Sequence, residues 1–580
     1  MLATIDDPSA LRGLGEEDLT RVANALRRHL IELGSSVGGH FAGSLGTVEL
    51  TVALHAIFDT PHDRIVWDVG HQAHGHKILT GRRDAMRRVK RADGPAGFLR
   101  RCESPYDAFG AGHAGTSISA ALGMAEASAR QGIGRFVVAV IGDGSATSGL
   151  SFEGLNHAAG LSSALRVVLN DNGMSIAPST GGLHETGDFR GYTTALGWHY
   201  VGPVDGHDLS ALCKAMDELR DGPGPALLHV KTRKGRGYAP AERDPYGWHA
   251  TRPFDVGSGE RAAAAAAPPS WTDCFADALG RIADRDERVV AITAAMPDGT
   301  GLDRFGQRHP DRVYDVGIAE QHAVTFAAGL AAEGMRPVCA IYSTFLQRAF
   351  DQIVHDVALQ TLPVTFALDR AGLVGADGPT HHGAFDLAYL RSIPGLVVAA
   401  PRDANDLQHL LATAIDSDRP FALRYPRGAA TGALDDPEPK PIAVGRGELL
   451  RAGDRVALVA LGKAVSEALR AADRLAERGI EASVVDARFA KPLDEALIRR
   501  VAGATGHVVT IEDHAVVGGF GSAVAELLAD ARAPVAIRRL GLPDRFIQHA
   551  EADAQWREAG IDAEAIVDAT LALLGEEERR

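Results

Sequence analysis

Two short polar motifs follow apolar segments in the amino-terminal third of the chain. The apolar stretch RFVVAVI, residues 135–141, runs into Gly142-Asp143-Gly144, and a second apolar stretch ends in Asn170-Asp171-Asn172. In a parallel sheet, the carboxyl ends of neighbouring strands lie at the same edge, where open α/β sheets bind ligands. We therefore expect Asp143 and Asn172 to share one metal ion.

The residue types at this edge suit a magnesium-held diphosphate. Mg²⁺ prefers carboxylate and carbonyl oxygens and completes its octahedron with phosphate oxygens. The glycines let the backbone approach the phosphates, and a helix after Gly144 would present free N–H groups. The competing interpretation is two glycine-containing turns after core strands. The strand contexts and the spacing of the two motifs together favour the metal site.

The rest of the chain supplies the elements that must position these residues. Apolar runs at 135–142, 166–170, 288–293, 363–369, 455–462 and 507–513 alternate with segments of helical period. This alternation predicts an α/β fold with three domains, each a largely parallel sheet flanked by helices. Two apolar stripes of helical spacing are expected to face the core: Leu19, Val22, Leu26 and Leu30, and Phe345, Ala349, Ile353 and Val357.

Two stretches rich in glycine, proline and alanine, 257–270 and 428–442, interrupt the apolar periods. They predict three domains, over 1–256, 272–430 and 440–580, with a linker over 257–271 between the first two.

Composition excludes several classes of function. The net charge of -15 and the pI near 5.8 disfavour a surface that binds nucleic acid or an anionic membrane. The four cysteines form no CxxC pair, which indicates reduced thiols rather than a zinc site or a disulfide framework. No basic start with an apolar run, and no apolar run of about 18 residues, occurs in the sequence. We expect a cytoplasmic protein that acts on small molecules.

The GDG and NDN motifs at this separation resemble the thiamine diphosphate motif, and nearly the whole chain resembles the 1-deoxy-D-xylulose-5-phosphate synthase family within the transketolase-like superfamily. The matching stretches include GGHFAGSLGTVELTVALH at 38–55, WDVGHQAHGHKILTGRRD at 67–84, GIAEQHAVTFAAGLA at 317–331 and DRAGLVGADGPTHHGAFDLAYLR at 369–391. The resemblance implies a homodimeric transferase that uses thiamine diphosphate and Mg²⁺ and forms carbon–carbon bonds. It also implies that 1–256 is the diphosphate- and magnesium-binding domain, 272–430 the pyrimidine-binding domain and 440–580 the transketolase-type carboxy-terminal domain.

The resemblance also assigns residues to the cofactor. It implies that Asp143, Asn172 and the main-chain carbonyl of Met174 hold Mg²⁺, and that Glu320 hydrogen-bonds the aminopyrimidine ring. Without the resemblance, Glu320 would be interpreted as an acidic residue that stabilises the start of a helix. The remaining implied cofactor contacts are His71, Gly112, His113, Ala114, Gly144, Ser145, Tyr238 and Phe345.

The same resemblance assigns residues to the substrates. It implies that pyruvate is decarboxylated and that the two-carbon fragment is joined to glyceraldehyde 3-phosphate, giving a precursor of isoprenoids, thiamine and pyridoxal. Proton transfer near the substrate would fall to four histidines, His40, His71, His249 and His381. Arg370 and Arg427 would clamp the acceptor phosphate, since a guanidinium offers paired hydrogen bonds. The other implied contacts of the acceptor are Tyr342, Arg348 and Asp377.

The sequence departs from this family after NDNGMSI at 170–176, where it is about fifty residues shorter before GPVDGHD at 202–208. Because that segment covers the site in the family, its loss can change the acceptor. A related thiamine transketolase or acyloin synthase and a catalytically silent paralogue therefore stay open as alternatives. A nucleotide-binding α/β protein is disfavoured, because neither GxGxxG nor GxxxxGK[ST] occurs between a strand and a helix.

Overall fold

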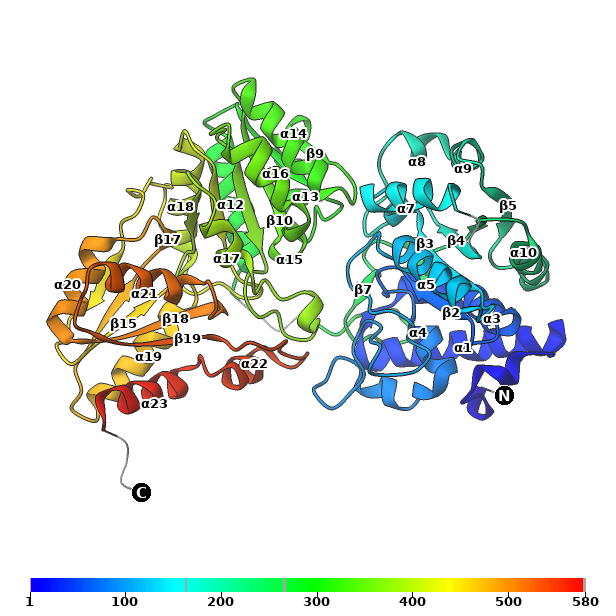
Figure 1. Cartoon of the computed structure of the whole chain (residues 1–580), viewed down its shortest axis with the longest axis horizontal. Coiled ribbons are helices and arrows are strands. Elements are labelled where there is room, and N and C mark those ends of the chain that lie inside the picture. The colour runs from blue at the N-terminus through cyan, green and yellow to red at the C-terminus, as the bar shows by residue number, and fades with distance from the viewer. Residues whose placement is uncertain (1, 162–163, 264–267, 577–580) are drawn as a thin grey trace. The chain divides into compact units, whose positions relative to one another are not determined.

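The computed structural model describes residues 2–161, 164–263 and 268–576. The contacts divide the chain into two compact units, one of Met1–Ala265 with Gly317–Ala319, and one of Ala266–Val316 with Glu320–Arg580. The first unit runs from blue to teal in Figure 1. Within the described ranges, no helix combines the length and the apolar character that are needed to cross a bilayer.

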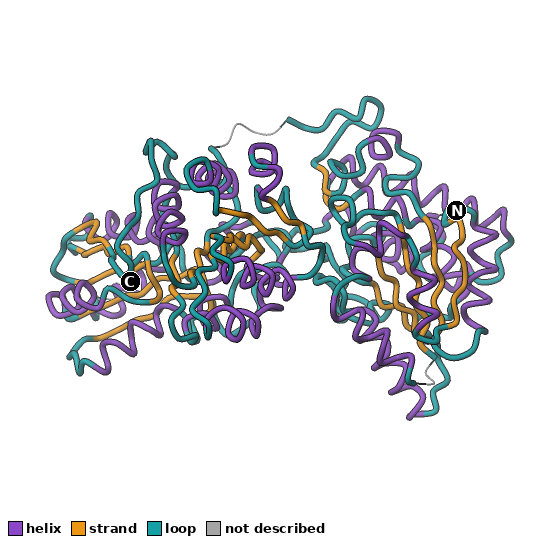
Figure 2. Tube along the Cα trace, turned by 90° about the horizontal axis from the view of Figure 1, so that it is seen from above, coloured by secondary structure: helices purple, strands orange, loops and turns teal. Residues whose placement is uncertain are grey.

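The first unit is built on a five-stranded sheet with all neighbours parallel, in the order β2-β3-β4-β6-β5. Purple helices flank its orange strands in Figure 2. The strands are β2 (Arg64–Trp67), β3 (Val137–Gly142), β4 (Leu165–Asp171), β5 (His199–Asp205) and β6 (Ala226–Lys231). The helices are α1 (Glu16–Val37), α2 (Ala42–Gly46), α3 (Val48–Ile57), α4 (His74–Lys77), α5 (Ser117–Gln131), α6 (Asp143–Ala146), α7 (Gly149–Ala159), α8 (Gly182–Thr186), α9 (Phe189–Ala195), α10 (Leu209–Asp221) and α11 (Ala239–Arg243).

Alternation along each strand produces two cores, one on each face of this sheet. In β3, Val138 and Val140 pack with the buried residues of α1, α3 and α10. Val137, Ala139 and Ile141 of the same strand pack on the other face with α5 and α7. Because both faces are covered, the interior strand β3 is apolar throughout, as is usual for strands of parallel sheets. The predicted stripe of Leu19, Val22, Leu26 and Leu30 is buried in α1.

The second unit holds two further sheets. Its seven-stranded sheet has the order β17-β12-β13-β11-β10-β8-β9, and its five-stranded sheet has the order β14-β16-β15-β18-β19. The strands are β8 (Val289–Thr293), β9 (Val313–Asp315), β10 (Arg336–Tyr342), β11 (Thr365–Asp369), β12 (Val397–Ala399), β13 (Phe421–Arg424), β14 (Glu448–Arg451), β15 (Val456–Ala460), β16 (Ala482–Asp486), β17 (Phe489–Lys491), β18 (His507–Ala515) and β19 (Ala536–Leu542).

Helices cover these sheets as predicted, and one core joins them. The helices are α12 (Trp271–Ala283), α13 (Leu302–Arg308), α14 (Glu320–Ala332), α15 (Ser343–Leu346), α16 (Phe350–Gln352), α17 (Asp386–Arg391), α18 (Ala404–Asp416), α19 (Ala464–Ala476), α20 (Glu495–Thr505), α21 (Phe520–Asp530), α22 (Ala552–Ala559) and α23 (Ala563–Leu574). Val398 of β12 and Val459 of β15 belong to the same apolar cluster. Strand β17 comes from the carboxy-terminal part of the chain but pairs antiparallel with β12. The predicted α/β class with largely parallel sheets is confirmed.

The predicted linker at 257–270 contains no helix and no named strand in its described residues. Residues 264–267 of this linker lie outside the described ranges. Residues 428–442 likewise separate β13 from β14 without a helix or a strand. The contact division places the second and third sheets in one unit.

Candidate active site

Asp143 and Asn172 directly follow the neighbouring parallel strands β3 and β4, as the sequence predicts. Gly142 pairs with Asn170 in the register of these strands. The backbone N–H of Asn172 donates to Oδ1 of Asp143 at 3.3 Å. The side chain of Asp143 is buried and that of Asn172 is half-buried. The two oxygen-bearing side chains therefore meet at the carboxyl edge of the sheet.

Residues of the shortened segment also reach Asp143. The Ser179 hydroxyl donates to Oδ2 of Asp143 at 2.8 Å, and Nδ1 of His184 lies 3.6 Å from the same oxygen. Burial raises the pKa of Asp143 to about 6, against the opposing hydrogen bond from Ser179. A cavity of about 440 Å³ adjoins these groups and is lined in part by Asn172, Ser179, His184 and Lys231.

The loop after β4 turns sharply beside Asp143. Gly173 has a φ of 72°, and the N–H of Met174 donates to Oδ1 of Asn172 at 3.1 Å. The ammonium of Lys234 donates to the carbonyl of Ser175 at 2.7 Å. Burial lowers the pKa of Lys234 to about 8, against the opposing charge of Asp143. Lys234 thus brings a buried cationic group to this loop.

The glycine after Asp143 is required by close packing. A Cβ atom on Gly144 would lie 2.8 Å from Cβ of Ser175, so a larger residue would displace the loop that carries Met174. Ser145 is buried, and its carbonyl accepts hydrogen bonds from the N–H of Ser148 and the hydroxyl of Ser151. The backbone at Gly144 and Ser145 is therefore fixed on both sides.

Three of the predicted histidines form a cluster in the first unit. The ring centroids of His40 and His249 are 5.5 Å apart, as are those of His71 and His249, and those of His40 and His71 are 6.3 Å apart. The short strands β1 (Gly39–His40) and β7 (Ala250–Thr251) pair antiparallel and bring the distant segments together. The Nδ1 atoms of all three rings are buried and have no hydrogen-bond partner.

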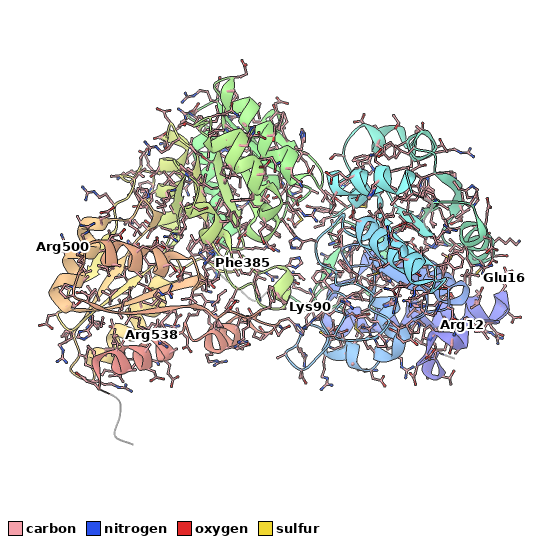
Figure 3. The ribbon with its side chains drawn as sticks, viewed as in Figure 1. Arg12, Glu16, Lys90, Phe385, Arg500 and Arg538 are labelled. Atoms are coloured by element: carbon pink, nitrogen blue, oxygen red, sulfur yellow. The ribbon has the colours of Figure 1, made fainter. Side chains whose placement is uncertain are left out.

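The environment of this cluster favours neutral imidazoles. Burial lowers the pKa of His71 to about 3, and it lowers the pKa values of His40 and His249 well below the usual value. The charge of Lys90, which Figure 3 labels, lowers the pKa values of His40 and His249 further. Near neutral pH each ring can therefore accept a proton at one nitrogen and donate from the other.

Two other predicted cofactor-contact regions of the first unit are held in place by hydrogen bonds and packing. The loop that carries Gly112, His113 and Ala114 precedes α5 and is held by Asp68, which accepts hydrogen bonds from the N–H groups of Gly115 and Ser117 at 2.8 and 3.0 Å. Tyr238 is buried among Phe41, Trp248 and Phe254. Its hydroxyl donates to the carbonyl of Val256 at 3.3 Å.

In the second unit, Glu320 is the first residue of α14 and is 4% exposed. Its Oε2 atom has no hydrogen-bond partner and lies 3.7 Å from a guanidinium nitrogen of Arg348. Burial raises the pKa of Glu320, while the charge of Arg348 opposes the shift. The result is a buried carboxyl group with one oxygen available to a ligand.

Other predicted residues of the second unit gather at the carboxyl ends of β10 and β11. Tyr342 ends β10 and pairs in register with Asp369, which ends β11. The Tyr342 ring stacks on Phe345 with centroids 5.5 Å apart, and the Arg370 guanidinium lies 4.0 Å from the Tyr342 ring centroid. The Phe345 ring packs against His381 at 5.6 Å. The Tyr342 hydroxyl and Nε of Arg370 are buried without hydrogen-bond partners.

Arg427 and Asp377 form an ion pair with a separation of 3.1 Å between Nη1 and Oδ2. The same nitrogen of Arg427 donates to the carbonyl of Val374 at 2.9 Å. Arg427 follows β13, the neighbour of β11, so it belongs to the same sheet edge as Arg370. Its side chain is 41% exposed, which leaves the guanidinium accessible to an anion.

The sequence of almost the whole chain matches known protein families. The family described as 1-deoxy-D-xylulose-5-phosphate synthase matches residues 2–190 and 189–232, the transketolase pyrimidine-binding domain matches 267–432, and the transketolase C-terminal domain matches 445–566. The chain is 50% identical to 1-deoxy-D-xylulose-5-phosphate synthase 1 of Geobacter sulfurreducens, over 99% of this chain and 97% of that protein. The chain belongs to the 1-deoxy-D-xylulose-5-phosphate synthase family.

Two further proteins are similar to this chain. The 1-deoxy-D-xylulose-5-phosphate synthase of Thermomicrobium roseum is also 50% identical, over 99% of this chain and 98% of that protein. Among solved structures, a split-gene transketolase described as an inactive beta4 tetramer is 31% identical, with a TM-score of 0.48, and the match covers 54% of this chain and 100% of that chain.

The alignment with the Geobacter protein is longer than this chain. It has 620 positions against 580 residues, so at least 40 positions face gaps in this chain. The family match falls into two pieces that meet at residues 189–190. These two residues begin α9 and lie within the segment that the sequence predicts to be short.

The site residues fit thiamine diphosphate and a divalent metal, on which this synthase family depends. Asp143 and Asn172 offer hard oxygen donors, which suit Mg²⁺. The described residues contain no cluster of three or more His, Cys, Asp or Glu side chains that could hold a metal ion. In the second unit, the unpartnered Oε2 of Glu320 suits a hydrogen bond to a ring nitrogen.

The structure places several residues that the sequence did not single out next to predicted site residues, within each unit. Lys234, Ser179 and His184 surround Asp143 or its loop. Asp369 is buried beside Arg370, and burial raises its pKa to about 6. The KGRGY stretch at 234–238 offered a signal for Lys234, whereas no spacing pattern relates Ser179 or His184 to Asp143.

Proposed function

We propose that this chain decarboxylates pyruvate and joins the two-carbon fragment to glyceraldehyde 3-phosphate, releasing CO₂ and 1-deoxy-D-xylulose 5-phosphate. The observation that carries this proposal is the 50% identity over 99% of the chain with a protein named for that synthesis. Two observations support it: in the first unit the N–H of Asn172 donates to Asp143, and in the second unit Oε2 of Glu320 is buried without a hydrogen-bond partner.

Asp143, Asn172 and the carbonyl of Met174 would hold Mg²⁺, which holds the diphosphate. Thiamine diphosphate, when bound, supplies the electron sink for decarboxylation. The protein orients it, and the fixed backbone at Gly144 limits how the loop can shift. The proposed cofactor contacts are His71, Gly112, His113, Ala114, Gly144, Ser145, Tyr238, Glu320 and Phe345.

Glu320 would hold a proton at Oε2 against the aminopyrimidine ring. Its burial raises its pKa, which favours the protonated carboxyl that such a hydrogen bond needs. Arg348 would keep the carboxyl oriented from 3.7 Å. The absence of a hydrogen-bond partner at Oε2 supports this role, since a buried oxygen without a partner is costly.

His40, His71 and His249 would move protons at the substrate. Their rings are neutral near pH 7 because burial depresses their pKa values, so a buried Nδ1 can take or give a proton. In the second unit, His381 would act similarly beside Phe345. We assign no single step to a single histidine.

Arg370 and Arg427 would bind the phosphate of the aldehyde acceptor. Both follow strands of the seven-stranded sheet, and both lower the pKa of Tyr342 against the larger effect of its burial. Two guanidinium groups at one edge suit a dianionic phosphate. Tyr342, Arg348 and Asp377 would complete the acceptor site, with Asp377 positioning Arg427 through their ion pair.

The proposal includes the organisation of the chain. It divides the chain into 1–256, 272–430 and 440–580, with a linker at 257–271, and three separate family matches, over 2–232, 267–432 and 445–566, support a division into three. We further propose a cytoplasmic homodimer. Light scattering on the purified protein checks the dimer, and fractionation of the source cells checks the location.

A second candidate is a related carboligase with another aldehyde acceptor, which the shortened segment beside Asp143 favours. Mass spectrometry after incubation with thiamine diphosphate, Mg²⁺ and pyruvate, with and without glyceraldehyde 3-phosphate, separates the two. Formation of 1-deoxy-D-xylulose 5-phosphate supports the first proposal. CO₂ release without that product supports the second, and absence of both together with absence of cofactor binding indicates a silent paralogue.

A further inference from the structure

A second cavity of the first unit lies at the other edge of its sheet. It has a volume of about 430 Å³, and its lining includes Arg64, Arg101 and Arg135. Arg64 is the first residue of β2 and pairs in register with Val137, the first residue of β3. The cavity therefore lies at the amino ends of the strands, whereas Asp143 follows a carboxyl end.

In the described residues, the three guanidinium groups of this cavity form no ion pair with a carboxylate. Arg64 donates one long hydrogen bond, of 3.5 Å, to the carbonyl of Pro105. Asp107 also lines the cavity, but its two oxygens each accept a hydrogen bond of 2.8 Å from Arg82. Nε of Arg135 is buried without any hydrogen-bond partner. An isolated surface arginine is usually solvated, whereas these three arginines line the same cavity.

The charged groups that shift the pKa of Arg64 are positive, like Arg64 itself. Its pKa is lowered by burial and then by the positive charges of Arg135 and Arg101. Like charges held together raise the free energy of the site unless an anion neutralises them. The concave shape and the unpartnered Nε of Arg135 thus suit an anionic ligand.

We propose that this cavity binds a small phosphorylated molecule at a site separate from the active site. Guanidinium forks match phosphate oxygens with paired hydrogen bonds, and three of them suit a diphosphate or two phosphate groups. Met124, Ala127 and Ile133 form an apolar wall, and Ile133 is 38% exposed. An apolar portion of the ligand would cover that wall, and the volume is within the usual range for small-molecule sites.

The test uses the full chain with thiamine diphosphate and Mg²⁺ already bound, so that the diphosphate site at Asp143 is filled. Inorganic pyrophosphate is titrated by calorimetry, with the same Mg²⁺ concentration in both solutions. The variants are Arg101→Gln, which changes an exposed residue, and Arg64→Gln combined with Arg101→Gln. Arg28→Gln, which changes an exposed arginine of α1 that does not line the cavity, is the matched control.

We expect saturable binding to the wild type, an affinity reduced about 10-fold by the double substitution, and an affinity within about twofold of wild type for Arg28→Gln. Retained binding of thiamine diphosphate and an unchanged circular dichroism spectrum would show that the variants are folded. The inference is overturned if the wild type shows no saturable binding, or if the double variant binds pyrophosphate as well as the control does. If the double variant fails to fold, the exposed Arg101→Gln alone decides, and an unchanged affinity then overturns the inference.

Discussion

The Ser179 hydroxyl donates a hydrogen bond of 2.8 Å to Oδ2 of Asp143, the carboxylate that follows β3. The donor lies in the segment 177–201, which the sequence predicts to be shorter than in the family, so this segment itself contacts the proposed metal ligand. A carboxylate oxygen has two lone pairs and can accept this bond beside a metal ion. Ser179 would then fix the orientation of the ligand.

Substitution of Ser179 tests this role. Ser179→Ala should weaken Mg²⁺ binding about 10-fold in the presence of thiamine diphosphate, because the carboxylate loses the bond that orients it. Ser179→Thr keeps the hydroxyl and should retain most of the affinity. Titration of Mg²⁺, followed by protein fluorescence, measures both variants. Equal affinities for alanine and wild type would contradict the role of Ser179.

Replacing Glu320 tests the proposed proton position. Glu320→Gln should lower turnover about 100-fold or more, since the amide cannot exchange a proton with the cofactor ring. Cofactor binding and the thermal midpoint should change little. Glu333→Gln, which changes an exposed residue just beyond the same helix, is the control. Steady-state kinetics decides, and full activity of Glu320→Gln would rule out the assigned role.

Removing the guanidinium of Arg427 tests the phosphate clamp. Arg427→Ala should raise the KM of glyceraldehyde 3-phosphate about 10-fold while leaving that of pyruvate nearly unchanged. Its ion pair with Asp377 is partly exposed and should contribute no more than about 1 kcal/mol to stability. Arg419→Ala, at an exposed position, is the control. An unchanged acceptor KM would leave Arg427 as an ion-pair partner only.

The buried histidines predict how stability depends on pH. Burial, with the charges of Lys77 and Lys90, lowers the pKa of His74 to about 3 in the folded state. The unfolded chain therefore binds a proton that the folded chain does not, and stability falls as the pH drops through about 6.5. Between pH 7.5 and 5.5 this group should remove about 1 kcal/mol from the free energy of unfolding.

His74→Gln should reduce that loss, so the difference in thermal midpoint between the two pH values should shrink by about 2 °C relative to wild type. His157→Gln, which changes an exposed histidine, is the control. Circular dichroism at both pH values measures the midpoints. The same pH dependence in His74→Gln and wild type would show that His74 does not carry the effect.

The lack of a side chain at Gly38 lets strands β1 and β7 pair, and this pairing brings His40 close to His249. The φ of Gly38 is 68°, and a Cβ atom would lie 2.5 Å from the carbonyl oxygen of Thr251 in β7. Gly38→Ala should separate β1 from β7, lower turnover and cost about 2 kcal/mol or more. Gly13→Ala has a similar positive φ but open space around it, so it isolates the backbone strain. Equal effects of the two substitutions would argue against the steric contact.

The sequence by itself determined the α/β class and the position of Asp143 beside Asn172. Apolar runs specify strands locally, and parallel neighbours must end at one edge, so two motifs after such strands are brought together by the geometry of the sheet. Family resemblance likewise indicated Glu320, because its local sequence is distinctive.

Only the tertiary structure decided the contacts that depend on the path of loops. It brought His40 to His249 through β1 and β7, placed Ser179 on Asp143, and paired β17 with β12 in the seven-stranded sheet. It also gathered Arg64, Arg101 and Arg135 around one cavity. These contacts join residues that are distant in sequence, and they form because burial and hydrogen bonding over the whole fold outweigh local preference.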